Sequence, residues 1–149
     1  MPNYKAKKTA NSAPSTKFGD AKRFDLTLVS VENLQYEQKS GRHIKVYAKV
    51  QLDDGAVTKT GRYMADEPNS TLNLNFSVQY PIRVNTRGKL VVRLYYKRTL
   101  RHTLGEVTID VTSLFDGWRE RNSDQNTTMS FQLPKGKLNI AYCFASGGN

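Results

Sequence analysis

Short apolar runs that alternate with polar residues follow one another from Phe24 almost to the end of the chain. In the run 44–52, apolar residues occupy every second position from Ile44 to Val50. Successive side chains of a strand point to opposite faces, so this spacing predicts a strand with one buried face. Similar runs predict seven further strands, at residues 24–30, 57–63, 74–80, 90–96, 104–109, 128–133 and 137–144.

Turn residues separate these runs, and only one segment has a helical pattern. The sequence Asp-Asp-Gly at 53–55 predicts a hairpin turn. A short helix is expected near 112–121, with Thr112 or Ser113 as its N-cap. Eight short strands with one short helix predict an all-β protein, an antiparallel sandwich or barrel.

The segment before the first run differs in composition. Residues 1–23 contain six Lys or Arg, one acid and few apolar side chains, so we expect a disordered basic tail there. The folded domain is then expected over 24–144, with a flexible C-terminus at 145–149. The whole chain has 23 Lys plus Arg and 13 Asp plus Glu, a formal net charge of +10. Such a charge favours polyanionic partners, namely nucleic acid, anionic lipid or an acidic protein.

Several segments, in their order and spacing, resemble the C2 domain family. Residues 31–34 (Val-Glu-Asn-Leu) are similar to the exit of the first C2 strand, and residues 41–50 to the second strand. Residues 69–73 (Asn-Ser-Thr-Leu-Asn) resemble the family's Asn-Pro-x-Trp-Asn segment, and 104–107 (Leu-Gly-Glu-Val) a later strand. Residues 136–144 resemble the last strand of small plant single-C2 proteins of the cold- and defence-responsive type.

This resemblance covers about residues 24–144 and implies a specific architecture. We expect an eight-stranded antiparallel C2-type β-sandwich with the type II strand order and one short helix. Plant proteins of this type are implied to act in stress and defence signalling.

The positions of the calcium ligands in the family hold different chemistry here. Calcium needs six to eight oxygen ligands, which calcium-binding C2 domains supply mainly as aspartates in their first and third loops. Lys45 stands where the second-strand aspartate is expected, and Lys97, Arg98, Arg101 and His102 occupy the third loop. We therefore expect no calcium at the usual site, and no other metal or cofactor.

The resemblance implies two candidate sites, both basic. Loops one and three leave a C2 sandwich at the same end, so their cations are expected to cluster into an anionic-lipid-binding tip. Its residues are Lys39, Arg42, Lys45, Lys97, Arg98, Arg101 and His102. A second patch resembles the phosphoinositide groove of some C2 domains and consists of Tyr47, Lys49, Lys59 and Tyr96. The alternatives are a solvated charged loop and ordinary sandwich aromatics.

Motifs of enzymes are missing from the sequence. His43 and His102 have no partners at metal-ligand spacing, and Cys143 lies in the last predicted strand as a small apolar group. We therefore predict that the protein is not an enzyme.

The start of the chain has no apolar signal core, and no run approaches the roughly 20 apolar residues that span a bilayer. We expect a cytoplasmic, peripheral membrane protein. Its predicted function is that of a calcium-independent C2-like module that binds anionic phospholipid membranes and acts as an adaptor in signalling. The alternatives are a basic nucleic-acid-binding protein and a protein-interaction domain for an acidic partner.

Overall fold

Two antiparallel sheets packed face to face form the protein. The computed structural model describes residues 17–37, 43–121 and 127–146. The first sheet has the order β5-β1-β9-β8. Its strands are β1 (Ala21–Glu32), β5 (Leu72–Pro81), β8 (Thr127–Leu133) and β9 (Gly136–Ser146). The first strand therefore pairs with the last one, along ten positions.

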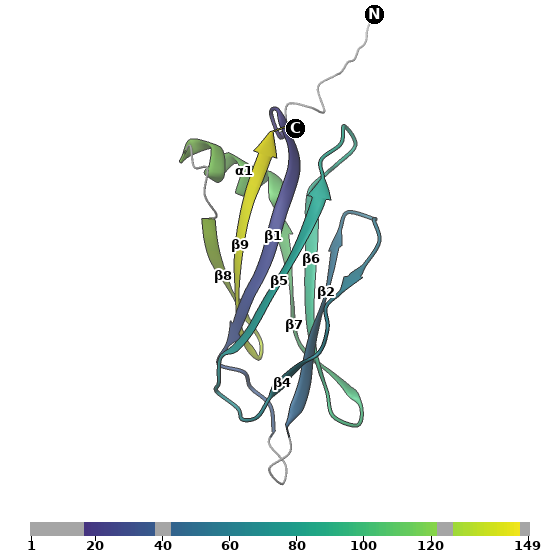
Figure 1. Cartoon of the computed structure of the whole chain (residues 1–149), viewed down its shortest axis with the longest axis vertical. Coiled ribbons are helices and arrows are strands. Elements are labelled where there is room, and N and C mark those ends of the chain that lie inside the picture. The colour runs from purple at the N-terminus through teal and green to yellow at the C-terminus, as the bar shows by residue number, and fades with distance from the viewer. Residues whose placement is uncertain (1–16, 38–42, 122–126, 147–149) are drawn as a thin grey trace, which may run out of the picture.

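The second sheet has the order β3-β2-β6-β7, with the short β4 also paired to β2. Its strands are β2 (Ile44–Leu52), β3 (Thr58–Lys59), β4 (Tyr63–Ala65), β6 (Lys89–Lys97) and β7 (Arg101–Asp110). Helix α1 (Val111–Glu120) follows β7 and lies at one end of the sandwich (Figure 1). The fold class expected from the sequence is confirmed: an all-β, two-sheet antiparallel sandwich with one short helix.

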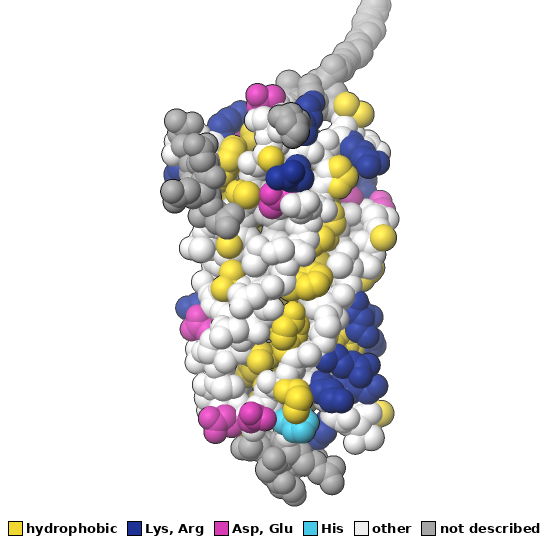
Figure 2. Space-filling model, viewed as in Figure 1, with side chains coloured by type: hydrophobic (Ala, Val, Ile, Leu, Met, Phe, Trp, Pro, Cys, Tyr) yellow, Lys and Arg dark blue, Asp and Glu magenta, His cyan; other side chains and the backbone are white. Residues whose placement is uncertain are grey.

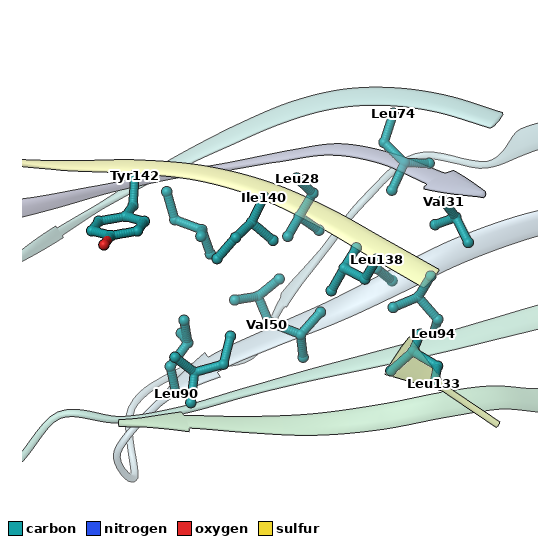
Figure 3. Close-up of a cluster of buried hydrophobic side chains, with 14 of the residues drawn as sticks. Leu28, Val31, Val50, Leu74, Leu90, Leu94, Leu133, Leu138, Ile140 and Tyr142 are labelled. Carbon is teal, nitrogen blue, oxygen red and sulfur yellow. The ribbon is translucent and has the colours of Figure 1, made fainter. Parts of the chain in front are cut away.

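The alternating apolar residues meet between the two sheets. Leu28, Ile140 and Leu138 from the first sheet face Val50, Leu90 and Leu94 from the second (Figure 3). All six side chains are fully shielded from solvent. Removing such apolar surface from water contributes about 25 cal/mol per Å², so this layer supplies the main stabilisation of the fold.

The folded domain begins before the predicted boundary at Phe24. Phe18 is only 2% exposed, and its ring lies 5.9 Å from that of Phe115 and 6.5 Å from that of Phe144. Strand β1 accordingly starts at Ala21, and at the other end β9 continues to Ser146. The expected tail at 17–23 is thus partly a core segment, because its one aromatic ring has aromatic partners. Residues 1–16 and 147–149 lie outside the described part.

The predicted strand 57–63 is two short strands instead of one. Thr60 interrupts it: its hydroxyl accepts a hydrogen bond from the Ala48 N–H at 2.9 Å and donates one to the Gly61 carbonyl at 2.7 Å. A side chain thus occupies a position in the ladder that a backbone group would otherwise fill.

The N-cap of α1 was also predicted wrongly. Asp110, not Thr112 or Ser113, caps the helix, since its carboxylate accepts from the Thr112 N–H at 3.0 Å. The hydroxyls of Thr112 and Ser113 donate to the same carboxylate at 2.5 and 3.2 Å. These hydrogen bonds lower the pKa of the Asp110 carboxyl, mainly through the Thr112 side chain.

Candidate anion-binding surface

The described parts of the two loops expected to form the basic tip lie at the same end of the sandwich. Residues 33–37, which follow β1, and the β6–β7 turn both lie at the end opposite α1 (Figure 1). Arg98 joins them, because its guanidinium Nη2 donates a hydrogen bond to the Glu37 carbonyl. Lys39 and Arg42, two predicted members of the tip, lie outside the described residues.

Three cations stand side by side where β2, β6 and β7 reach this end. Lys45 is paired with Lys97, and Lys97 is paired with Arg101. All three side chains are exposed. Like charges directly opposite one another in a sheet are destabilising. A local arrangement that opposes stability is typical of a functional site, and this one favours an anion between the strands.

Stacked tyrosines lie next to these cations. Tyr47 on β2 and Tyr95 on β6 are register partners whose rings lie 5.2 Å apart. Lys59 Nζ lies 4.7 Å from the centroid of the Tyr47 ring. The Arg101 guanidinium and Lys49 Nζ lie 5.0 and 5.5 Å from the Tyr95 centroid. The negative faces of the rings attract the cations, so these interactions restrain otherwise flexible side chains.

Between the tyrosines and the β6–β7 turn the surface is hollowed to a volume of about 360 Å³. We call this feature the basic hollow; it is lined by Tyr47, Lys59, Arg62, Lys97, Thr99, Leu100 and Arg101. Four of these residues are cations and none is an acid. Lys and Arg side chains also gather toward this end of the molecule, at the lower right of the view in Figure 2.

The two sites predicted separately therefore adjoin each other on one face. Lys97 and Arg101 were assigned to the tip, whereas Tyr47 and Lys59 were assigned to the groove. All four line the basic hollow. Further along β6, Arg93 is bound to Glu106 at 2.7 Å, so the charge of this arginine is balanced.

The predicted site residues Tyr96, Arg98 and His102 are not among those that line the basic hollow. Tyr96 is 6% exposed and packs in the core, with its ring 5.9 Å from that of Tyr36. His102, its register partner, stacks on it at 4.8 Å instead of lining the basic hollow. Arg98 is half-buried and holds the two loops together. Tyr95 takes the place that was predicted for Tyr96.

The sequence prediction missed four residues of this surface: Arg62, Tyr95, Thr99 and Leu100. Alternation from Leu94 assigns Tyr95 to the outer face, so a signal for this residue existed. Arg62 lies between β3 and β4 and belongs to no strand, so strand periodicity could not identify it as a surface residue of this site. Leu100 is 71% exposed in the turn, an unusual position for a large apolar side chain.

Other candidate chemistry lies away from the basic hollow. Burial and the neighbouring Asp25 carboxylate raise the pKa of the Cys143 thiol, which disfavours the thiolate that a nucleophile requires. Within residues 17–37, 43–121 and 127–146, no three His, Cys, Asp or Glu side chains group as metal ligands would. No helix in the same part of the chain has the length and apolar character needed to cross a membrane.

Comparison with known proteins identifies the family. A family model described as "C2 domain" matches residues 22–133, about three quarters of the sequence. The chain belongs to the C2 domain family. The matched model is that of a C2 domain and includes no catalytic domain, and C2 domains are in general modules that bind membranes and lipids. No curated protein sequence matches the chain.

Solved structures share the fold at low sequence identity. A C2 domain of plant Extended Synaptotagmin 1 aligns with a TM-score of 0.65 and 13% identity, covering 87% of this chain and 98% of that one. A C2 domain-containing protein from a putative elicitor-responsive gene aligns with a TM-score of 0.59 and 18% identity, covering 87% and 93%. Human GIVD cytosolic phospholipase A2 aligns with a TM-score of 0.62 and 15% identity, covering 85% of this chain and 17% of that one.

Proposed function

We propose that this C2 domain binds anionic phospholipid membranes through the basic hollow, without calcium, and acts as a peripheral adaptor in signalling. The observation that carries the proposal is the set of four cations beside Tyr47, with no carboxylate among the lining residues. Near an anionic leaflet each such cation contributes about 1 kcal/mol. Four cations therefore supply adhesion of useful strength, which the remaining basic residues increase.

The chemistry of the hollow suits a phosphate group. Arg62 and Arg101 carry planar guanidinium groups, which hold phosphate oxygens with paired donors. Lys59 and Lys97 add point charges from the other strands. A volume of about 360 Å³ is at the small end of ligand sites. A lipid headgroup that carries phosphates, such as a phosphoinositide, is the ligand class we infer.

Leu100 adds an apolar contact at the same place. Its side chain is 71% exposed in the turn between Arg98 and Arg101. Burying a leucine in an apolar medium contributes about 1.5–3 kcal/mol. If the cations bind the headgroups, Leu100 lies at the depth where the acyl chains begin. We therefore propose that this end of the sandwich points into the membrane.

Fixed cations replace the bridging metal in this proposal. Lys45 and Lys97 are register partners, and by the resemblance to C2 domains they stand where calcium-binding members carry carboxylates, so a divalent cation would be repelled there. The similarity of the last strand to small plant single-C2 proteins supports a role in stress or defence signalling, which stays a prediction.

A binding panel with the full chain tests the proposal. We would measure sedimentation with phosphatidylcholine vesicles, with vesicles containing phosphatidylserine or a phosphoinositide, and binding to single-stranded RNA. Each measurement would be made in calcium and in chelator, across a salt series. We expect binding to the anionic vesicles in chelator, equal binding in calcium, and weaker binding at high salt. Tighter binding to RNA at every salt concentration, or binding that chelator abolishes, would overturn the proposal.

A further inference from the structure

Two lining residues of the basic hollow carry a hydroxyl group, Tyr47 and Thr99. Tyr47 is only 6% exposed, so Thr99 is the accessible one of the two. Thr99 is exposed in the β6–β7 turn and shares the hollow with Lys59, Arg62, Lys97 and Arg101. In this chain, therefore, a nucleophilic side chain stands within a cluster of cations. A negative group attached to it would lie where the proposed ligand binds.

We propose that Thr99 is a phosphorylation site, and that its phosphate occupies the basic hollow from within and releases the protein from anionic membranes. The inference rests on the function proposed above, since it concerns the same hollow. In the reaction, the γ-phosphoryl group of ATP passes to Thr99 Oγ1. ADP leaves, and the hydroxyl proton goes to the catalytic base of the kinase.

The surroundings of Thr99 suit a protein kinase that prefers basic substrates. Lys97 and Arg98 precede the hydroxyl and Arg101 follows it, so an acidic substrate groove would attract the segment. The turn itself has a weak closing contact, because the Arg98 N–H donates to the Leu100 carbonyl at 3.4 Å. Thr99 and Leu100 are both exposed at the apex of this turn, so the hydroxyl is accessible to an enzyme.

Other threonines nearby lack this combination. Thr60 is 4% exposed, and its hydroxyl already bonds to the backbone. Thr58 lies on β3 and lines a different depression of the surface. Of the described threonines, Thr99 alone lines the basic hollow.

The electrostatic effect follows from the charge of the phosphate. A phosphothreonine carries about −1.5 to −2 charges at neutral pH, together with three strong acceptor oxygens. A tethered group acts at an effective concentration in the millimolar range or above, so it competes with a lipid phosphate for Lys97, Arg101 and their neighbours. Each cation near a leaflet strengthens binding roughly fivefold, so cancelling two weakens it about 25-fold.

The test uses the full chain with phosphothreonine incorporated at a single position. Position 99 is compared with position 128, because Thr128 is exposed on β8 in the other sheet and its phosphate brings the same charge. Affinity is measured on vesicles of phosphatidylcholine with about 30% phosphatidylserine, an anionic surface of the kind that attracts basic segments. We expect about 25-fold weaker binding for the variant at 99 and less than about threefold for the variant at 128. Phosphorus NMR should also show a lower second pKa for the phosphate at 99, because cations surround it.

The outcomes separate the two proposals. If the unmodified chain does not bind these vesicles, the proposed function fails. If the unmodified chain binds and the form phosphorylated at 99 binds equally well, the regulatory inference fails while the function stands. Equal losses at 99 and 128 would show that net charge alone acts, and would also overturn the inference. In a parallel arm, a basophilic kinase with ATP should phosphorylate Thr99 of the native chain, and mass spectrometry that finds Thr99 unmodified would count against the site.

Discussion

The substitution Lys97→Glu should raise stability while it weakens membrane binding. Lys97 is paired with Lys45 on one side and with Arg101 on the other, so a glutamate there would face two cations. Opposite charges directly across a sheet contribute about 0.2–1 kcal/mol per pair, and like charges cost a similar amount. Replacing two repulsive pairs by two attractive ones should therefore stabilise the fold by about 0.8–4 kcal/mol in principle. Exposure of all three side chains to solvent reduces this to about 1 kcal/mol.

The effect on binding has the opposite sign. The change removes one attractive contribution of about 1 kcal/mol and adds a repulsion of similar size, a loss of about 1–2 kcal/mol. Affinity for anionic vesicles should fall about 5- to 30-fold. Thermal melting should move upward by about 3–5 °C for each kcal/mol gained in a domain of this size.

Lys22→Glu is the matched control for this variant. Lys22 is exposed near the start of β1, and its carbonyl accepts from the Ile82 N–H at 2.9 Å, at the end of the sandwich away from the hollow. Its substitution changes the net charge by the same two units. Vesicle sedimentation and thermal melting of both variants would be measured in one buffer. Equal losses of binding would mean that net charge drives association, and a Lys97→Glu protein that melts earlier would refute the reasoning from the paired cations.

Three further changes probe the membrane contact and the fold. Leu100→Ser should weaken vesicle binding about 10-fold with an unchanged melting temperature, since its side chain is 71% exposed; a change in melting instead of binding would contradict this. Gly105→Ala should lower the free energy of unfolding by about 1–3 kcal/mol, because an added Cβ would lie 2.8 Å from Leu133 Cβ. An unchanged midpoint of chemical denaturation would show that the neighbouring strand moves to accommodate the methyl group. Asp110→Ala should cost about 1 kcal/mol at neutral pH through loss of the N-cap. Since folding lowers the pKa of the Asp110 carboxyl, this stabilisation is present above the unfolded-state pKa and disappears as the pH falls through the folded-state pKa. The melting temperatures of variant and parent should therefore converge in acid, and a difference that persists there would refute this prediction.

Alternation of apolar and polar residues was enough to predict most strands, because each strand of a sandwich buries one face. Strand β2 shows this most clearly: Ile44, Val46, Ala48 and Val50 are all buried. The prediction failed at 57–63 for a reason that alternation does not encode. The Thr60 hydroxyl bonds to a backbone N–H of β2, and that contact exists only once β2 lies beside it.

The error at Tyr96 has a different origin. Leu90, Val92 and Leu94 lie on the inner face of β6, and Tyr96 continues their spacing into the core. Alternation along β6 therefore indicates a core position, whereas the resemblance to a family groove implied a place in the surface site. Where a local pattern and a distant resemblance disagree about a side chain, the pattern is the better guide, because it follows from the geometry of the strand.

The joining of the two predicted sites depends on pairings between distant segments. Lys59 and Lys97 are far apart in the sequence, but β2 pairs with both β3 and β6 and so brings them to one face. Arg62 joins them from a connection that belongs to no strand. The sequence shows which residues are cations but not how the strands pair, so only the folded chain shows that these charges lie close together. Repulsion among them lowers the stability of the free protein, and an anion that binds there relieves it. If the proposed anion binds there, it should stabilise the fold by relieving this repulsion, which is the linkage expected of an anion-binding site.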